Sequence, residues 1–162
     1  MKAAVVYHSE SGNTAKMAGF IVDGLQAAGL EAKAFSVDEV DQDFAKESKV
    51  LLVGTPVYAG SFSGKMKMWL EKGAGAAQPG GKLCGAFATA NFIHGGADVS
   101  ILAILNHLMV MGALVYPGGA ALGQPFIHYG PVAIAPELDN YNDLFKTYGQ
   151  RLGQKALELL KD

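Results

Sequence analysis

Short apolar runs alternate along the chain with segments in which apolar residues recur every three or four positions. The runs predict strands, because a short unbroken apolar stretch is typical of a strand that is buried on both faces. Five such strands are predicted, at residues 3–7, 31–36, 50–54, 83–90 and 113–116.

The periodic segments predict helices. In the first helix, Met17, Ile21, Leu25 and Ala28 share one face, and Gly29 is placed to end it. Three more helices are predicted: a short one after Ser63-Gly64, one around residues 101–111 with Asp98 as its cap, and a closing one over residues 141–159.

Strands that alternate with helices imply a parallel sheet covered on both faces, so the predicted fold class is α/β. A length of 162 residues suits one domain, and we expect residues 1–162 to form it. Residues 117–136 are rich in Gly, Pro and Ala and are expected to be irregular, either as a partner surface or as a lid.

A polar loop directly after the first strand predicts an anion site. It reads Ser9-Glu10-Ser11-Gly12-Asn13-Thr14 and leads into the first helix. The free amides and the positive dipole end of a helix start favour a phosphate, and the loop hydroxyls can complete the cage. The alternative is an ordinary turn in which Ser11 or Asn13 caps the helix.

With the preceding residues Val5-Val6-Tyr7-His8, this loop resembles the phosphate-loop signature of the flavodoxin family. The resemblance implies a flavodoxin-like three-layer sandwich whose five-stranded parallel sheet has the order 2-1-3-4-5. It also implies non-covalent FMN, with its phosphate held by residues 9–14. In that order the ligand crevice lies at the carboxyl ends of the first and third strands.

Two later loops are predicted to hold the flavin ring. The first, after the third strand, offers small residues for close approach and one aromatic face; its candidate residues are Thr55, Pro56, Val57, Tyr58, Ala59 and Gly60. The second, after the fourth strand, offers an amide, a second aromatic ring and glycine amides; its candidates are Thr89, Ala90, Asn91, Phe92, His94, Gly95 and Gly96. Alone, each loop could equally be a glycine-rich turn.

These two loops look like those of the WrbA-type NAD(P)H:quinone oxidoreductases. The matching stretches are Gly54-Thr55-Pro56, Gly60, Ser63-Gly64, His94-Gly95-Gly96 before Asp98, and Tyr129-Gly130. The resemblance allows a homo-oligomer. The chain departs from that family at Ala97 and Met111, where glutamine and an active-site histidine are usual, and in lacking a longer insertion between the second and third strands.

Two functions follow from these resemblances. The first is an FMN-dependent oxidoreductase that takes hydride from NAD(P)H and reduces a quinone-like acceptor, with His94 as the catalytic residue beside that acceptor. The alternative is an electron carrier that docks on redox partner proteins. Residues 55–62 contain no acid, so we expect fully reduced FMN to be less disfavoured here than in a site ringed by carboxylates.

The amino-acid composition limits the classes of partner and the cellular compartment that we expect. A net charge of −2 argues against nucleic acid or an anionic membrane as the main partner. Arg151 is the only arginine, which nearly excludes an arginine clamp on the cofactor phosphate. Cys84 is the only cysteine, and neither a signal peptide nor a membrane span is recognisable, so we expect a cytoplasmic protein. The histidine and cysteine spacings predict no metal.

Overall fold

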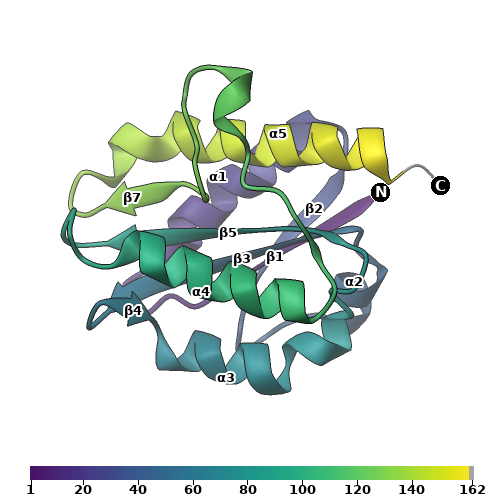
Figure 1. The fold of residues 1–162 in the computed structure, drawn as a ribbon, viewed down its shortest axis with the longest axis horizontal. Helices are drawn as coiled ribbons and strands as arrows, with labels where there is room; N and C mark the ends of the chain where they lie inside the picture. Colours follow the sequence, from purple (N-terminus) through teal and green to yellow (C-terminus); the bar gives the residue numbers. More distant parts are fainter. Residues whose placement is uncertain (161–162) are drawn as a thin grey trace.

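A parallel sheet lies between two helical layers in the computed structural model, which describes residues 1–160 (Figure 1). The main strands follow the spatial order β2-β1-β3-β5-β6, and β7 also pairs with β5 in parallel. Their bounds are β1 Lys2–Tyr7, β2 Glu31–Ser36, β3 Val50–Tyr58, β5 Leu83–Ala90, β6 Leu114–Val115 and β7 Val132–Ile134. The predicted order 2-1-3-4-5 is thereby confirmed, with β6 and β7 sharing the last position.

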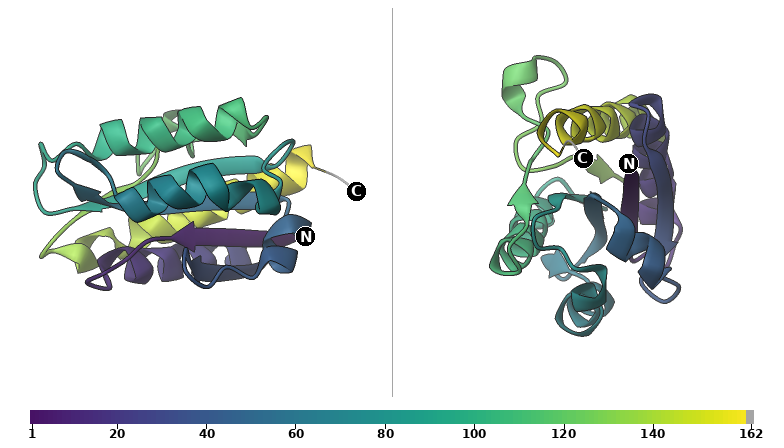
Figure 2. Two further views of the ribbon diagram at one scale, coloured as in Figure 1. Left: turned by 90° about the horizontal axis from the view of Figure 1, so that it is seen from below. Right: turned by 90° about the vertical axis from the view of Figure 1, so that its right-hand side faces the viewer.

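The helices divide between the two faces of the sheet. Figure 2 shows α1 and α5 on one side and α3 and α4 on the other. The helix bounds are α1 Asn13–Ala27, α2 Gln42–Glu47, α3 Gly64–Lys72, α4 Ala97–Val110 and α5 Asn142–Leu159. Short 3-10 turns cover Ala74–Ala77, Ala120–Leu122 and Leu138–Tyr141.

Each face of the sheet has its own core, because successive strand residues point to opposite sides. In β1, Ala4 and Val6 belong to the core under α3 and α4, whereas Ala3 and Val5 belong to the core under α1 and α5. Three residues of the predicted stripe of α1, Met17, Ile21 and Leu25, are buried in the second core, and the fourth, Ala28, is half-buried against it at the C-cap. Gly29, at φ 95°, follows the end of the helix as expected.

Four details differ from the sequence-based expectations. The helix α2 and the hairpin strand β4 (Ser61–Phe62) were not predicted. The strand β7 lies inside the segment expected to be irregular. The prediction that Asp98 caps the fourth helix was wrong: Gly96 occupies the cap position, and Asp98 lies in the first turn.

The segment between β6 and β7 is anchored by the only arginine. Arg151 of α5 is buried and donates hydrogen bonds to five backbone carbonyls of this segment, at distances of 2.9 to 3.4 Å. The accepting residues are Gly119, Leu122, Gly123, Gln124 and Pro125. Both terminal nitrogens of the guanidinium group donate to carbonyls, which solvates its charge without a counter-charge. The arginine therefore serves the fold and is directed away from the phosphate loop.

Within residues 1–160, no helix combines the length and the apolar character that crossing a membrane requires.

Candidate functional site

The loop between β1 and α1 has the backbone of an open anion site. Gly12 sits at the N-cap of α1 in the left-handed conformation, at φ 87°, and no side chain caps the helix. The alternative in which Ser11 or Asn13 caps α1 is therefore wrong. Because the first amides of a helix have no intrahelical acceptor, those of α1 are available to a ligand.

Side chains of the same loop add unused polar atoms. The Oγ of Ser9 is buried and has no hydrogen-bond partner within the described residues. The Oγ1 atoms of Thr14 and Thr89 lie 2.8 Å apart, and both side chains are buried. An orphaned buried hydroxyl is costly unless a ligand or water satisfies it. Ser9 thus fits a bound phosphate.

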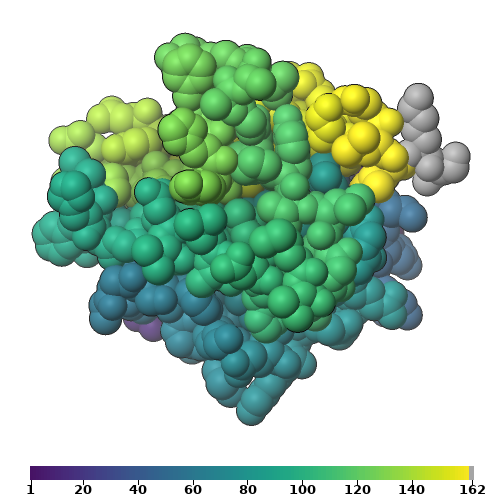
Figure 3. All heavy atoms as spheres, viewed as in Figure 1, coloured from purple at the N-terminus to yellow at the C-terminus, as the bar shows by residue number. Residues whose placement is uncertain are grey.

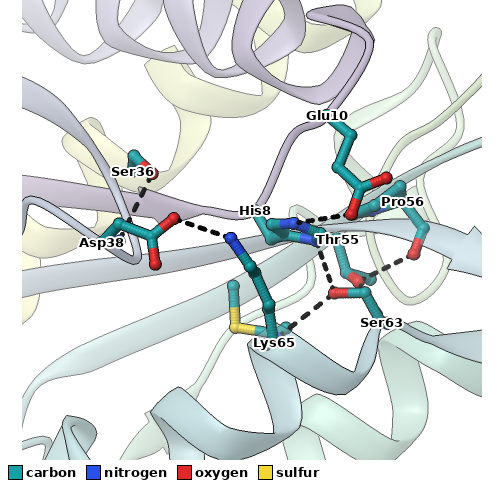
Figure 4. A network of polar contacts seen from close by, with 9 residues as sticks. His8, Glu10, Ser36, Asp38, Thr55, Pro56, Ser63 and Lys65 are labelled. Carbon is teal, nitrogen blue, oxygen red and sulfur yellow. Dashed lines mark hydrogen bonds and ion pairs between the residues drawn. The ribbon is translucent and has the colours of Figure 1, made fainter.

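A polar network joins this loop to β3 and to the start of α3 (Figure 4). The Nδ1 of His8 lies 2.8 Å from the Oγ of Ser63, which caps α3 by accepting from the amide of Met66. The Nε2 of His8 lies 3.7 Å from Glu10, close enough for an ion pair when the imidazole is protonated. Burial lowers the pKa of His8, and Glu10 opposes that shift.

Glu10 also connects this network to Tyr58 of β3. Burial, followed by the charge of Glu10, raises the pKa of Tyr58. The rings of His8 and Tyr58 meet edge to face with centroids 6.1 Å apart. Lys65 is directed elsewhere, toward Asp38 at 3.1 Å. The carboxylate that acts on the Tyr58 ring is therefore Glu10, which belongs to the phosphate loop.

Two adjoining hollows lie at the carboxyl ends of the central strands. The smaller, of about 70 Å³, is lined by Ser11, Asn13, Pro56, Val57, Tyr58, Thr89, Ala90 and Asn91. The larger, of about 530 Å³, shares four of these residues and adds Ala59, Gly60, Phe92, His94 and Gly95. Every lining residue belongs to the predicted set, so the structure brings the three predicted loops together at one place.

The loop after β3 and the loop after β5 contact each other through glycine residues. Ala59 and Gly60 both have positive φ angles, 50° and 80°, as a two-residue hairpin between β3 and β4 requires. A Cβ added to Gly96 would lie 2.3 Å from the carbonyl oxygen of Gly60. The backbones of the loops therefore approach each other closely, and Gly96 contributes to that contact.

Some predicted residues face other environments. Thr55 is fully buried: its hydroxyl donates to the carbonyl of Pro56 and accepts from the amide of Ser63. His94 is exposed, and it also borders a separate hollow of about 490 Å³ with Ile93, Asp98 and Tyr141. Thr55 thus shapes its loop from inside, whereas His94 lies on the rim between two hollows.

The hydrogen bond between His8 and Ser63 was not predicted from the sequence. Strand periodicity carried a usable signal, because Ala4, Val6 and His8 alternate onto the same face, which α3 covers. In residues 1–160, no group of three or more His, Cys, Asp or Glu side chains is arranged to hold a metal ion.

Comparison with known proteins agrees with this geometry. The family model described as flavodoxin matches residues 5–90. The chain is 39% identical to a flavodoxin of Clostridium saccharobutylicum, over 98% of this chain and 99% of that protein. It is 27% identical to an NAD(P)H dehydrogenase (quinone) of Paraburkholderia phymatum, over 80% and 73%.

Solved structures show the same fold. An archaeal flavodoxin superposes with a TM-score of 0.80 at 25% identity, covering 96% of this chain and 98% of that one. A WrbA-like flavodoxin from Agrobacterium tumefaciens superposes with a TM-score of 0.79 at 20% identity, covering 97% and 98%. The chain belongs to the flavodoxin family, whose cofactor is FMN.

Proposed function

We propose that the two hollows and the loop beneath them form the FMN site. The observation that carries this proposal is the buried, unpartnered Oγ of Ser9 beside the uncapped start of α1. The phosphate would be held by Ser9, Glu10, Ser11, Gly12, Asn13 and Thr14, through amides and hydroxyls and without a basic side chain.

The ring would lie in the larger hollow. Tyr58 and Phe92, both exposed at its rim, would flank the ring, and backbone groups of Ala59, Gly60, Asn91, Gly95 and Gly96 would meet its polar edge. Thr55, Pro56, Val57, Thr89 and Ala90 form the floor beneath it. Amides are well suited to this edge because they offer hydrogen bonds without imposing charge.

The function best supported is electron carriage between redox partner proteins. FMN supplies electron storage, and the chain supplies an open rim at which a partner can approach: Phe92 is 74% exposed and Ile93 is 81% exposed. The likeness to the Clostridium flavodoxin extends over nearly the whole of both chains, which favours the carrier over an enzyme.

A second candidate is an NAD(P)H:quinone oxidoreductase. The position of His94 supports it, because an imidazole between two hollows could donate a proton to an acceptor oxygen held in either. The quinone dehydrogenase relatives add support at lower identity.

Anaerobic mixing of the FMN-loaded protein with NADH and, separately, NADPH tests the two candidates. A carrier keeps its flavin oxidised with both nucleotides yet accepts electrons from dithionite in two separate one-electron steps. Rapid bleaching by either nucleotide, followed by quinone turnover that falls in His94→Gln, would instead establish the enzyme. Loss of FMN binding in the control Leu157→Lys, on the far surface of α5, would contradict the proposed site.

A further inference from the structure

The sequence contains a long stretch without formal charge. All 13 lysine and arginine residues and all 15 acidic residues lie outside residues 99–136, which contain two histidines, His107 and His128. This stretch comprises most of α4, the strands β6 and β7, and the segment that Arg151 anchors. Soluble domains normally distribute charge over their whole surface, so an uncharged stretch of this length is unusual for exposed structure.

Apart from Asp98, which is exposed in its first turn, the helix α4 is mostly apolar on both its inner and its outer side. Ile101, Ile104, Leu105 and Leu108 face the sheet and are buried. The outward side carries Val99, Leu102, Ala103, Asn106, Met109 and Val110. Val99 is 60% exposed and Val110 is 90% exposed. A helix that is hydrophobic all round is normally buried, so the outward side lacks a covering in the single chain.

The same face extends beyond α4. Figure 3 shows α4 and the segment from β6 onward together on the side of the molecule turned to the viewer. This segment also exposes large apolar side chains, namely Leu114, Leu122, Phe126 and Tyr129. We call the outward side of α4 with these four residues the uncharged face. Exposed apolar patches of this extent mark interaction sites.

We propose that a second copy of this chain covers the uncharged face, in a two-fold dimer with α4 packed against α4. The absence of charge points to this occupant. Interface cores are depleted of charged residues, and a two-fold interface must be complementary to itself. An uncharged face satisfies that condition, because no like charges meet across the axis.

Asn106 fits the same arrangement. It is exposed near the middle of the outward stripe, between Leu102 and Met109, and is the one strongly polar residue that the stripe carries from Val99 to Val110. An amide carries both donors and an acceptor, so two copies of Asn106 near a two-fold axis can satisfy each other. A single polar residue in an apolar helix interface also fixes the register of the pair.

A membrane is a poorer occupant. Binding to anionic lipid depends on lysine and arginine, and residues 99–136 contain neither. A charged redox partner is also a poorer occupant, because the uncharged face carries no charges that could complement those of the partner.

Sedimentation velocity of the full FMN-loaded chain, from micromolar to millimolar concentration, tests the dimer. We expect the wild type to dimerise, and Val99→Lys and Val110→Lys each to raise the dimer dissociation constant by about a hundredfold, because each buries two unpaired ammonium groups. Leu157→Lys, at a 42% exposed position on α5, is the matched control and should leave the dimer intact.

A wild type that remains monomeric at every concentration would overturn the proposal. So would lysine variants that dimerise as well as the wild type. A monomer that sediments with phosphatidylcholine vesicles would identify a lipid surface as the occupant instead. Circular dichroism verifies folding, and the high exposure of Val110 means that the isolated chain should accommodate lysine there.

Discussion

At the scale of single residues, one hydroxyl hydrogen decides what the Thr14–Thr89 pair can bind. Two hydroxyls 2.8 Å apart share two hydrogens, and their mutual bond uses one. The other hydrogen is free for an acceptor beside the phosphate loop. The pair is therefore suited to an anion, although neither hydroxyl is unpartnered.

Thr14→Val should weaken FMN binding by about tenfold or more, since a hydrogen bond to a charged group contributes about 1.5–3 kcal/mol. Quenching of FMN fluorescence during titration of the apoprotein measures this. Thr89→Val is the matched variant. It keeps the Thr14 hydroxyl, so its loss of FMN affinity should be smaller than that of Thr14→Val. If the wild type and Thr14→Val bind FMN with equal affinity, the hydroxyl of Thr14 does not contact the phosphate.

His8 should make the protein less stable in mild acid. Burial holds its pKa in the folded state below the ordinary value of 6.5, so the unfolded chain binds more protons as the pH falls through that value. The groups around His8 are Glu10, Lys65 and Asp38, with the Tyr58 ring at its edge.

His8→Asn can keep a hydrogen bond to Ser63 and cannot titrate. Between about pH 7.5 and about pH 5, urea unfolding should show a smaller loss of stability for this variant than for the wild type. His128→Asn, at an exposed position, should behave like the wild type. Identical pH dependence in His8→Asn and the wild type would contradict the role given to burial.

At the scale of elements, local pattern predicted most strands and helices but not the contacts between distant parts. The loops of the site were predictable because parallel strands end at one edge of a sheet. The pairs His8–Ser63 and Thr14–Thr89 were not, since their members are 55 and 75 residues apart. The strand β7 was missed because three residues carry too little periodicity, and its pairing with β5 is non-local.

The contact between α1 and α5 depends on glycine. A Cβ on Gly149 would lie 2.2 Å from the carbonyl oxygen of Ile21, so Gly149→Ala should destabilise the protein by about 1–3 kcal/mol. Gly19→Ala, on α1 with nothing within 4 Å, should stabilise it by about 0.5–1 kcal/mol through helix propensity. Thermal melts compare the two, and shifts of the same sign would contradict this packing.

At the scale of the whole molecule, the charges around the site set how readily FMN is reduced. The loop after β3 has no acid, and Lys65 is paired with Asp38. Glu10 is the carboxylate that acts on Tyr58. Few negative charges near the ring favour a less negative potential than a site ringed by carboxylates would give.

Glu10→Gln should make the potential less negative by about 40 mV, which corresponds to about 1 kcal/mol for one electron. A potentiometric titration measures the shift. Glu158→Gln, near the far end of α5, is the control and should leave the potential of the bound FMN unchanged. An unchanged potential in Glu10→Gln would mean that solvent screens this carboxylate from the ring.

Arg151 has a consequence for the order in which the chain is completed during synthesis. Its five acceptor carbonyls lie between residues 119 and 125, so this segment leaves the ribosome before the arginine that fixes it. Until α5 docks, those carbonyls can be satisfied only by water. The nascent chain therefore has to carry an unanchored loop beside a newly formed helix α4 until α5 has been made and has docked.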